Sequence, residues 1–417
     1  MTNSAPVIKI IDKPCGSGKT TRMIKGFEPE KKYLVIVPLL TEVNRIINLS
    51  TEVKFVQPHA NDNQKGTKLA SLQEQLLLGH NIVSTHKMYE SLVPLAKAGL
   101  LDDYHIIIDE VPDAVQPIAN KSKTSIEEFY IASGYMVVEE GSGLVRPTQK
   151  WIEQSSQVSD TLSVKILTAA MSGCLYLQDR QMFIWALPES ILRTGLSLTV
   201  LTYKASGSLF LSYIRKLGLP YELIADLVSD KEFKEQAAKL ITIEDIPALS
   251  KLKLTYSGQK AGQASRAYCS RVSNALKNLR ERKLKGVAVG SIMVTCMKDA
   301  WLKPSNDNHS LLAQSGLFSR GSRLVDAIWL PNTTRGTNDY AHCSHLIYLY
   351  DQYPHPFLTR WLGDSSKEFA DAYALTELIQ WVWRSRVRRG EPITVYLPSQ
   401  RMRRLFEDWV NQYSLLV

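Results

Sequence analysis

Short apolar runs alternate with amphipathic stretches along the first half of the chain. Runs rich in Val and Ile indicate buried strands, and apolar residues that recur every three or four positions indicate helices. Strands that alternate with helices are typical of a parallel α/β sheet. The expected strands are Val7–Ile11, Tyr33–Val37, Val53–Val56, Asn81–Val83, Tyr104–Ile108 and Leu198–Leu201. The expected helices are Thr20–Lys25, Glu42–Leu49, Lys68–Leu78 and Lys87–Ala98.

Two regions interrupt this alternation. Residues 121–190 are less regular, and Tyr176–Trp185 has the pattern of a hairpin, so we expect a small insertion on the sheet. Residues 223–262 are charged and only weakly periodic, which favours a linker between two domains. The predicted division is therefore domain 1 over 1–222, a linker over 223–262 and domain 2 over 263–417.

The α/β pattern resumes after the predicted linker, without a second phosphate loop. This half is therefore also expected to form a sheet covered by helices. Its expected strands are Ser291–Cys296, Asp326–Leu330, Ser344–Tyr350 and Ile393–Leu397. Its expected helices are Ala264–Arg282, Ser366–Trp383 and Gln400–Tyr413.

Composition narrows the class of protein only a little. A chain of 417 residues with 44% hydrophobic and 22% charged residues suits two or three globular domains. The formal charge of +9 gives weak support to a polyanionic partner. The five cysteines include no C-x-x-C pair, so neither a zinc ribbon nor a disulfide framework is indicated, and a reducing cytoplasm is expected. We see no secretion signal, and charges interrupt the most apolar region, so no membrane span is expected.

A glycine-rich turn follows the first strand and precedes the first helix. Its glycines, Gly16 and Gly18, allow backbone N–H groups to approach a phosphate, Lys19 can reach the β- and γ-phosphates, and Thr20 can ligate Mg²⁺. Lys13 stands where the first glycine of the full G-x-x-x-x-G-K-[ST] pattern would be, a departure that helicase-type loops tolerate. A chance glycine turn is the alternative. The expected ATP-binding residues here are Pro14, Cys15, Gly16, Ser17, Gly18, Lys19, Thr20 and Thr21.

Two acidic residues end the apolar strand at 104–108. A phosphate-loop enzyme needs a carboxylate at the end of a neighbouring strand to hold Mg²⁺, and Asp109 fits that role. Glu110 is then placed to orient or deprotonate the attacking water. The alternative is a strand that simply ends in a polar turn.

A third group lies near the end of a predicted helix. Gln380, Arg384 and Arg388 are spaced four residues apart, so they are expected to share one helix face and to present two guanidiniums to a phosphate. Arginines that meet a transferring phosphate in this way accelerate its transfer. The alternative is a solvated basic helix end.

Together these motifs resemble the superfamily 2 helicases, most closely the compact type encoded by bacterial viruses. Cys15–Thr21 resembles motif I, Asp109–Pro112 a variant of motif II, and Gln380–Arg388 motif VI. Other segments resemble the remaining motifs: Ile36–Pro38 with Thr41–Ile46 (Ia), Ser84–His86 (the T-[TS]-H element), Val200–Tyr203 (III), Ile292–Thr295 (IV) and Asn332–Asp339 (V). Motif III lacks its usual S-A-T. The second arginine of motif VI would fall at Val387, which leaves Arg386 and Arg388 as candidates. Arg388 is favoured because it is expected to share a helix face with Gln380 and Arg384.

The resemblance implies a fold and a set of partners. The fold would be two tandem RecA-like domains with an ATP cleft between them, using ATP and Mg²⁺, with Gly336 and Asp339 of motif V also binding the nucleotide. It implies contacts to the sugar–phosphate backbone by Pro38, Thr85, His86, Thr295 and Thr334, although a loop or cap role is the alternative for each. Aromatic residues of the run Tyr348–Phe357 could stack on bases or pack a core.

The function implied is an ATP-dependent helicase that moves along single-stranded nucleic acid and unwinds duplex, with DNA favoured over RNA. A monomeric cytoplasmic protein that works with replication or recombination proteins is expected. Two other readings stay open. A phosphate-loop kinase or nucleotide-binding regulator would leave residues 380–388 without a role, and a nucleic-acid-binding protein without unwinding activity would not need Lys19, Thr20, Asp109 and Glu110.

Overall fold

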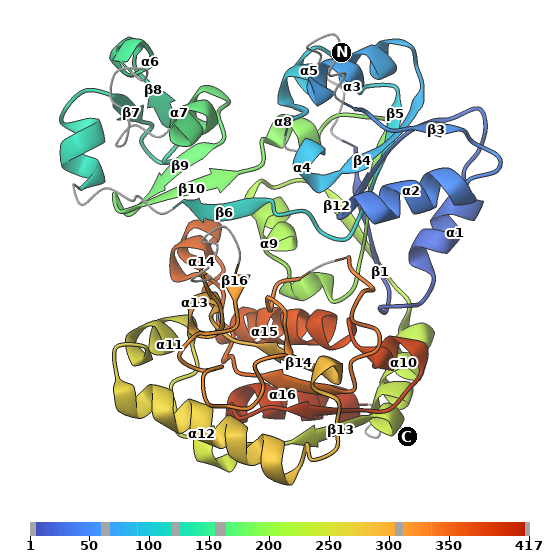
Figure 1. The fold of residues 1–417 in the computed structure, drawn as a ribbon. Helices are drawn as coiled ribbons and strands as arrows, with labels where there is room; N and C mark the ends of the chain where they lie inside the picture. The colour runs from blue at the N-terminus through green and yellow to red at the C-terminus, as the bar shows by residue number, and fades with distance from the viewer. Residues whose placement is uncertain are drawn as a thin grey trace. The chain divides into compact units, whose positions relative to one another are not determined.

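The computed structural model describes residues 6–59, 67–89, 91–118, 125–154, 164–304, 312–334 and 336–412. They form two compact units (Figure 1). Unit 1 contains the described residues of Met1–Asp12, Gly18–Ala225 and Pro354–Phe369. Unit 2 contains those of Lys13–Ser17, Asp226–Tyr353 and Ala370–Val417.

The main sheet of unit 1 is wholly parallel. Its seven strands run in the order β12-β1-β11-β5-β2-β4-β3. All six expected strands are present, and Tyr221–Ala225 adds a seventh beside β1. The strands are β1 (Ile8–Asp12), β2 (Lys32–Val37), β3 (Phe55–Val56), β4 (Asn81–Thr85), β5 (Tyr104–Asp109), β11 (Ser197–Thr202) and β12 (Tyr221–Ala225).

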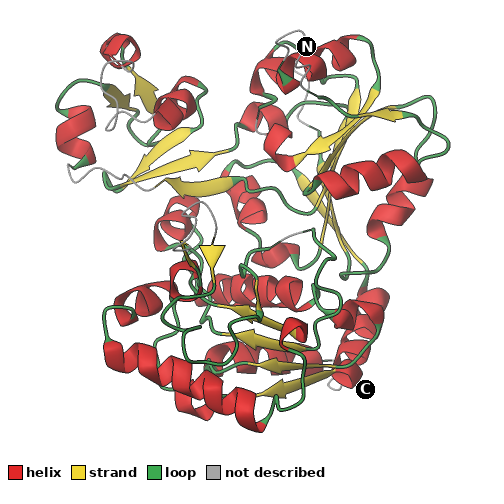
Figure 2. Cartoon of the chain, viewed as in Figure 1, coloured by secondary structure: helices red, strands yellow, loops and turns green. Residues whose placement is uncertain are grey.

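Helices cover both faces of this sheet (Figure 2). Alternate residues of β2 point to opposite faces, so Leu34 and Ile36 join one apolar cluster while Val35 and Val37 join the other. The second cluster holds α1 (Lys19–Lys25) and α2 (Leu40–Leu49). The first holds α3 (Lys68–Leu77), α4 (His86–Tyr89), α5 (Val93–Lys97), α8 (Glu189–Leu192) and α9 (Leu209–Lys216). The single helix expected over Lys87–Ala98 is thus two short helices, with Glu90 outside the described residues.

Helix α14 (Pro356–Leu362) belongs to unit 1 although it lies late in the sequence. Leu358, Trp361 and Leu362 are buried in the same cluster as β1 and α9. The Trp361 ring stacks on Tyr213 with centroids 5.8 Å apart. The aromatic run that ends at Phe357 therefore leads into a core helix.

The expected insertion forms a small subdomain with its own core. The predicted hairpin is confirmed as β9 (Leu175–Gln178) and β10 (Met182–Ala186), which are antiparallel, and β6 (Val115–Ile118) pairs on the other edge of β10. Gln178 pairs with Met182, and Asp179 and Arg180 in the turn between them both have positive φ, a conformation common in tight turns. The remaining elements are η2 (Glu127–Ile131), β7 (Met136–Val138), β8 (Val145–Pro147), α6 (Gln149–Gln154) and α7 (Val164–Met171).

Unit 2 is built on a second parallel sheet in the order β13-β19-β18-β14-β17. Helix α12 (Arg266–Arg282) packs on one face through Val272 and Leu276. On the other face, the Tyr348 ring meets Trp381 of α15 (Lys367–Val382) edge-on at 5.3 Å. The strands are β13 (Ile241–Glu244), β14 (Ile292–Thr295), β17 (Ile328–Trp329), β18 (His345–Tyr348) and β19 (Ile393–Tyr396). The other main elements are α10 (Leu227–Leu240), α11 (Tyr256–Gly262), α13 (Lys298–Trp301), η6 (Arg386–Arg389) and α16 (Gln400–Asn411), and Tyr413, the expected end of α16, lies outside the described residues.

The stretch 223–262, expected as a linker, is instead regular structure. It completes β12 of the first sheet and then forms α10, β13 of the second sheet and α11. Its sequence looks like a linker because α10 buries only Phe233 and Ala237, so most of the helix is charged surface.

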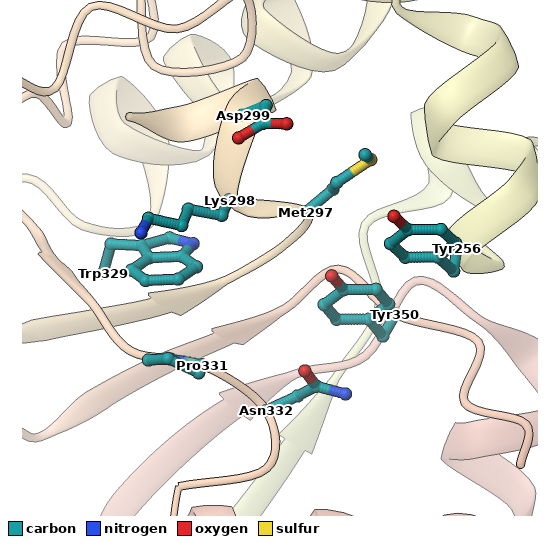
Figure 3. A pocket seen from close by; sticks show the side chains of 8 residues that line it. All are labelled: Tyr256, Met297, Lys298, Asp299, Trp329, Pro331, Asn332 and Tyr350. Carbon is teal, nitrogen blue, oxygen red and sulfur yellow. The ribbon is translucent and has the colours of Figure 1, made fainter. Parts of the chain in front are cut away.

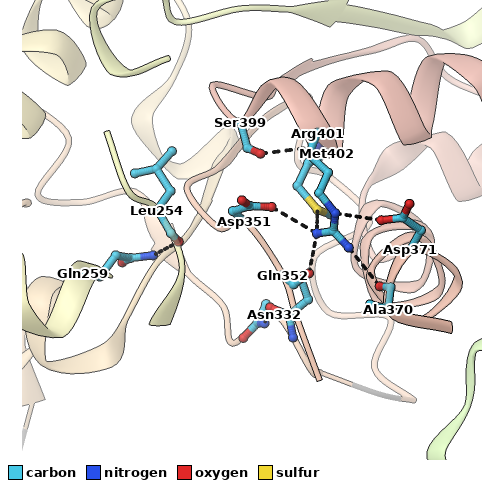
Figure 4. A network of polar contacts seen from close by, with 10 residues as sticks. All are labelled: Leu254, Gln259, Asn332, Asp351, Gln352, Ala370, Asp371, Ser399, Arg401 and Met402. Atoms are coloured by element: carbon cyan, nitrogen blue, oxygen red, sulfur yellow. Dashed lines mark hydrogen bonds and ion pairs between the residues drawn. The ribbon is translucent and has the colours of Figure 1, made fainter. Parts of the chain in front are cut away.

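Arg401 of α16 holds together segments of unit 2 that are distant in sequence (Figure 4). Its guanidinium bonds to the carboxylates of Asp351 and Asp371 at 3.1 and 2.7 Å and to the carbonyl of Gln352 at 2.7 Å. The Tyr353 ring also lies 3.9 Å from the guanidinium carbon. These bonds fix the segment that follows β18.

No helix among the described residues is long and apolar enough to cross a membrane.

Candidate nucleotide site and nucleic-acid face

The polar residues expected to bind nucleotide follow strands that end at one edge of the unit 1 sheet. Asp12 of β1 is in register with Thr202 of β11, and Leu201 of β11 is in register with Asp109 of β5. Because all these strands are parallel, their carboxyl ends lie at the same edge, where α/β sheets bind ligands.

The glycine-rich loop between β1 and α1 has the backbone that its glycines permit. Gly16 and Gly18 have φ angles of 77° and 75°, and a Cβ at either position would meet nothing within 4 Å. Glycine is therefore required here by backbone conformation and not by crowding. Lys13, which replaces the first glycine of the full pattern, forms a 3.1 Å ion pair with Asp226, and Asp226 in turn caps α10.

Two side chains after the loop are positioned by the neighbouring strands. Lys19 Nζ donates to the Thr202 carbonyl at 3.1 Å, and Thr20 Oγ1 donates to Asp109 Oδ2 at 2.8 Å. Thr21 accepts from Arg45 at 3.1 Å. The structure therefore brings Lys19, Thr20 and Asp109 together, as the sequence predicted, and directs Thr21 toward α2.

Asp109 is a buried carboxyl, only 7% exposed. Its pKa is raised to about 6, first because burial removes water from the carboxylate and then because Glu110 adds negative charge. The hydrogen bond from Thr20 and the charge of Lys19 act in the opposite direction. A hydroxyl and a carboxylate this close, with the carboxylate poorly solvated, fit a Mg²⁺ ion that takes its remaining ligands from water and phosphate.

Glu110 has an unusual backbone. Its φ is 64°, a left-handed conformation that costs a non-glycine residue on the order of 1 kcal/mol. Its N–H donates to the Leu201 carbonyl at 2.9 Å, which extends the pairing of β5 with β11. The turn directs the chain out of the sheet directly after Asp109, so the two carboxylates do not follow the alternation of a strand.

Asp12 is a site residue that the sequence analysis missed. Its carboxylate accepts from the backbone N–H groups of Lys204 and Ala205 at 2.7 and 3.0 Å. It thus holds the loop after β11, where Lys204 has a φ of 58°. Burial raises the pKa of Asp12, while these two hydrogen bonds lower it. An acidic residue at the end of the strand before the phosphate loop was the available signal.

The unit 1 residues expected to contact nucleic acid, Pro38, Thr85 and His86, differ in their contacts and burial. His86 Nε2 lies 2.9 Å from the Asp109 carbonyl, so this side chain contacts the end of β5. Thr85 ends β4 and is half-buried, and Pro38 follows β2 and is also half-buried. A surface role remains open for Pro38 and Thr85.

The shared helix face expected for Gln380, Arg384 and Arg388 is wrong. Helix α15 ends at Val382, and Ser385 has extended backbone before the 3₁₀ turn η6 begins. Gln380 and Arg384 are buried, 2% and 3% exposed, whereas Arg388 is exposed. The i, i+4, i+8 argument fails because it assumed helix through residue 388.

Arg384 and Arg386 are both engaged with backbone in unit 2. Arg384 bonds to the Thr337 carbonyl at 3.4 Å, and Arg386 Nε donates to the Pro392 carbonyl at 2.7 Å. The Thr337 hydroxyl donates to Asp339 Oδ2 at 2.8 Å, and Gly336 has a φ of 72°. Arg384 therefore supports the Gly336–Asp339 loop. Arg335, within the same motif, lies outside the described residues.

The unit 2 residues expected to contact nucleic acid, Thr295 and Thr334, also have different surroundings. Thr295 ends β14 and is fully buried, so its side chain is not available to a strand in this conformation. Thr334 Oγ1 donates to the Pro331 carbonyl at 2.8 Å, a local turn contact. In the aromatic run, Tyr348 is fully buried and packs in the core, whereas Tyr353 lies against Arg401 and is 48% exposed.

Comparisons with known proteins agree with this architecture. A family model described as the YonV C-terminal Rossmann-like domain matches residues 235–410. The SPbeta prophage-derived uncharacterized protein YonV of Bacillus subtilis (strain 168) is 26% identical over 426 residues, covering 97% of this chain and 98% of that protein.

Two solved structures cover nearly the whole chain. XPD in its apo form covers 98% of this chain and 95% of its own, with a TM-score of 0.50 and 13% sequence identity. Xpd4 of S. tokodaii covers 97% of this chain and 94% of its own, with a TM-score of 0.48 and 14% identity. At this level of identity the likeness to XPD shows the fold alone, which is that of two RecA-like α/β domains. The fold predicted from the motifs is confirmed.

Proposed function

We propose that this chain hydrolyses ATP with Mg²⁺ and couples hydrolysis to movement along single-stranded nucleic acid, DNA foremost, so that it unwinds duplex. The observation that carries the proposal is the Thr20–Asp109 hydrogen bond directly behind the phosphate loop. It joins a hydroxyl and a carboxylate in the relation that a phosphate-bound metal requires. The helicase fold, with the Gly336–Asp339 loop and Arg384 in unit 2, supports the coupling to nucleic acid.

Each of the following site residues has a definite task in this proposal. Lys19 pairs with phosphate oxygens, and its bond to the Thr202 carbonyl holds the ammonium close to the loop beforehand. Thr20 and Asp109 hold Mg²⁺, which supplies charge neutralisation at the phosphates when bound. Glu110 accepts a proton from the attacking water. Arg388 stabilises charge that develops on the phosphate, and Arg384 acts as a positioning residue for the Gly336–Asp339 loop.

Nucleic acid binding is assigned to exposed and half-buried positions only. Pro38, Thr85 and Thr334 remain candidates for backbone contacts, which fix a strand in place without reading its sequence. Thr295 is withdrawn as a direct contact because its side chain is buried, and His86 is reassigned to support Asp109.

Strand-dependent ATP hydrolysis tests the proposal. Hydrolysis is measured with matched DNA and RNA oligonucleotides, each single- and double-stranded, and without nucleic acid. We expect single strands to stimulate hydrolysis, and the better stimulant identifies the track. A kinase or nucleotide-binding regulator would hydrolyse ATP at one rate under all these conditions, and a binding protein without a working nucleotide site would not hydrolyse it.

A further inference from the structure

A pocket in unit 2 is lined by three aromatic side chains from separate parts of the chain (Figure 3). Tyr256 comes from α11, Trp329 ends β17, and Tyr350 follows β18. Lys298, Asp299 and Asn332 also line it and provide a positive charge, a negative charge and an amide. Tyr256 is 60% exposed, so the pocket presents an aromatic surface to solvent.

Buried hydrogen bonds fix the wall that carries Tyr256. Gln259, three residues further along α11, is fully buried. Its amide donates to the carbonyls of Leu254 and Leu349 at 2.9 and 2.8 Å and accepts from the Met297 N–H at 3.0 Å. It thereby ties α11 to the segments that follow β18 and β14. A polar side chain with all these bonds made inside a core holds its surroundings rigidly.

The other two rings are also held in place. Trp329 donates its indole N–H to the Cys296 carbonyl at 3.1 Å, which leaves the faces of the ring for packing. Tyr350 is 7% exposed, and burial raises its pKa above the usual value, so its hydroxyl stays protonated and can donate. Asn332 is oriented by a 2.6 Å bond to Gln352.

We propose that this pocket receives one base of a bound single strand, stacked against Tyr256 and Trp329. A nucleobase is flat and aromatic with a polar edge, which matches aromatic walls bordered by an amide and a hydroxyl. Lys298 is exposed at the rim, where a flanking phosphate would lie, and the net charge of +9 suits the strand. This inference rests on the proposed function, because it deepens how the same protein grips its track.

The test compares strands with and without bases. Binding of the full-length protein to a labelled oligothymidylate, and to an abasic strand of equal length, is measured at one salt concentration. Tyr256→Ala should reduce the preference for the base-bearing strand by about 5- to 100-fold, and leave abasic binding unchanged. Trp329→Ala should act in the same direction. Tyr256→Phe keeps the ring and should keep the preference.

The outcomes separate this inference from the proposed function. If the wild-type protein binds neither strand, the nucleic-acid function fails. If it binds strands but Tyr256→Ala and Trp329→Ala keep the full preference for bases, only the pocket assignment is overturned. If Tyr256→Ala instead weakens ATP binding and leaves the strand preference intact, the pocket holds the nucleotide and this inference is wrong. Tyr256 is mostly exposed, so its variants test the pocket even if Trp329→Ala misfolds.

Discussion

Thr20 Oγ1 donates a 2.8 Å hydrogen bond to Asp109 Oδ2, although the two residues are separated by 89 positions in the chain. The bond joins the start of α1 to the end of β5. Burial disfavours ionisation of the Asp109 carboxyl, and the hydrogen bond from Thr20 offsets only part of that cost. A buried carboxylate whose ionisation is disfavoured suits a site where a bound cation neutralises its charge.

At neutral pH and with no nucleotide bound, the Asp109→Asn variant should be more stable than the wild-type protein. The pKa of Asp109 in the fold, about 6, lies above the ordinary 3.8, so its contribution to stability is full below about pH 4 and is lost as pH rises through 6. An asparagine side chain does not ionise, so the variant does not lose this contribution to stability as pH rises. The variant should match the wild type near pH 4 and gain up to about 3 kcal/mol in free energy of unfolding above pH 7. Urea unfolding of both proteins across this range measures the difference, and a gain that does not change with pH would contradict it.

Lys19→Ala should abolish ATP hydrolysis and leave the fold intact. The side chain donates a hydrogen bond to the Thr202 carbonyl, and losing such a bond costs about 1 kcal/mol of stability. Lys25→Ala removes an exposed charge from the same helix and serves as the control with normal turnover. Hydrolysis and thermal unfolding are measured for both variants. Normal turnover in Lys19→Ala would remove the phosphate-loop assignment.

Two substitutions at Glu110 should separate its backbone from its carboxylate. Glu110→Gln and Glu110→Gly both remove the charge and should both lose turnover while binding ATP. Only glycine accepts a φ of 64° without strain, so Glu110→Gly should be more stable than Glu110→Gln by about 1 kcal/mol. Chemical denaturation gives the comparison. Equal stability would show that the turn carries no strain, and retained turnover would show that the base is elsewhere.

Arg388→Ala should lose turnover by ~10³-fold, about 4 kcal/mol of barrier, while ATP binding stays nearly normal. Its effect belongs to the transition state, so it should appear in kcat and not in affinity. Arg389→Ala is the matched control, because it removes a neighbouring exposed guanidinium from the same turn. Single-turnover hydrolysis and equilibrium ATP binding are measured for both variants. If Arg389→Ala is the inactive variant, the register assigned to this motif is wrong by one residue.

The sequence predicted both sheets because buried parallel strands are continuous apolar runs, as at Ile106–Ile108. The proximity of Thr20 and Asp109 was also predictable, since strand ends in a parallel sheet meet at one edge. Where a helix ends depends on local backbone that periodicity does not encode, and so the end of α15 at Val382 was missed. Asp12 was missed because its partners, Lys204 and Ala205, are far along the chain.

The sequence pattern also could not predict packing between segments that are far apart in the chain. Helix α14 joins the core of unit 1 through Trp361, although its sequence neighbours lie in unit 2. Helix α10 exposes most of its surface, so its sequence is hard to distinguish from a linker. In both cases the tertiary contacts, and not the local pattern, determine where the segment belongs.

The rate of ATP hydrolysis by the wild-type protein, with and without saturating single-stranded oligonucleotide, tests the central claim most directly. The account predicts Mg²⁺-dependent hydrolysis that rises as single strand is added and then saturates. Hydrolysis at the same rate with and without any DNA or RNA strand, or no hydrolysis at all, would contradict it.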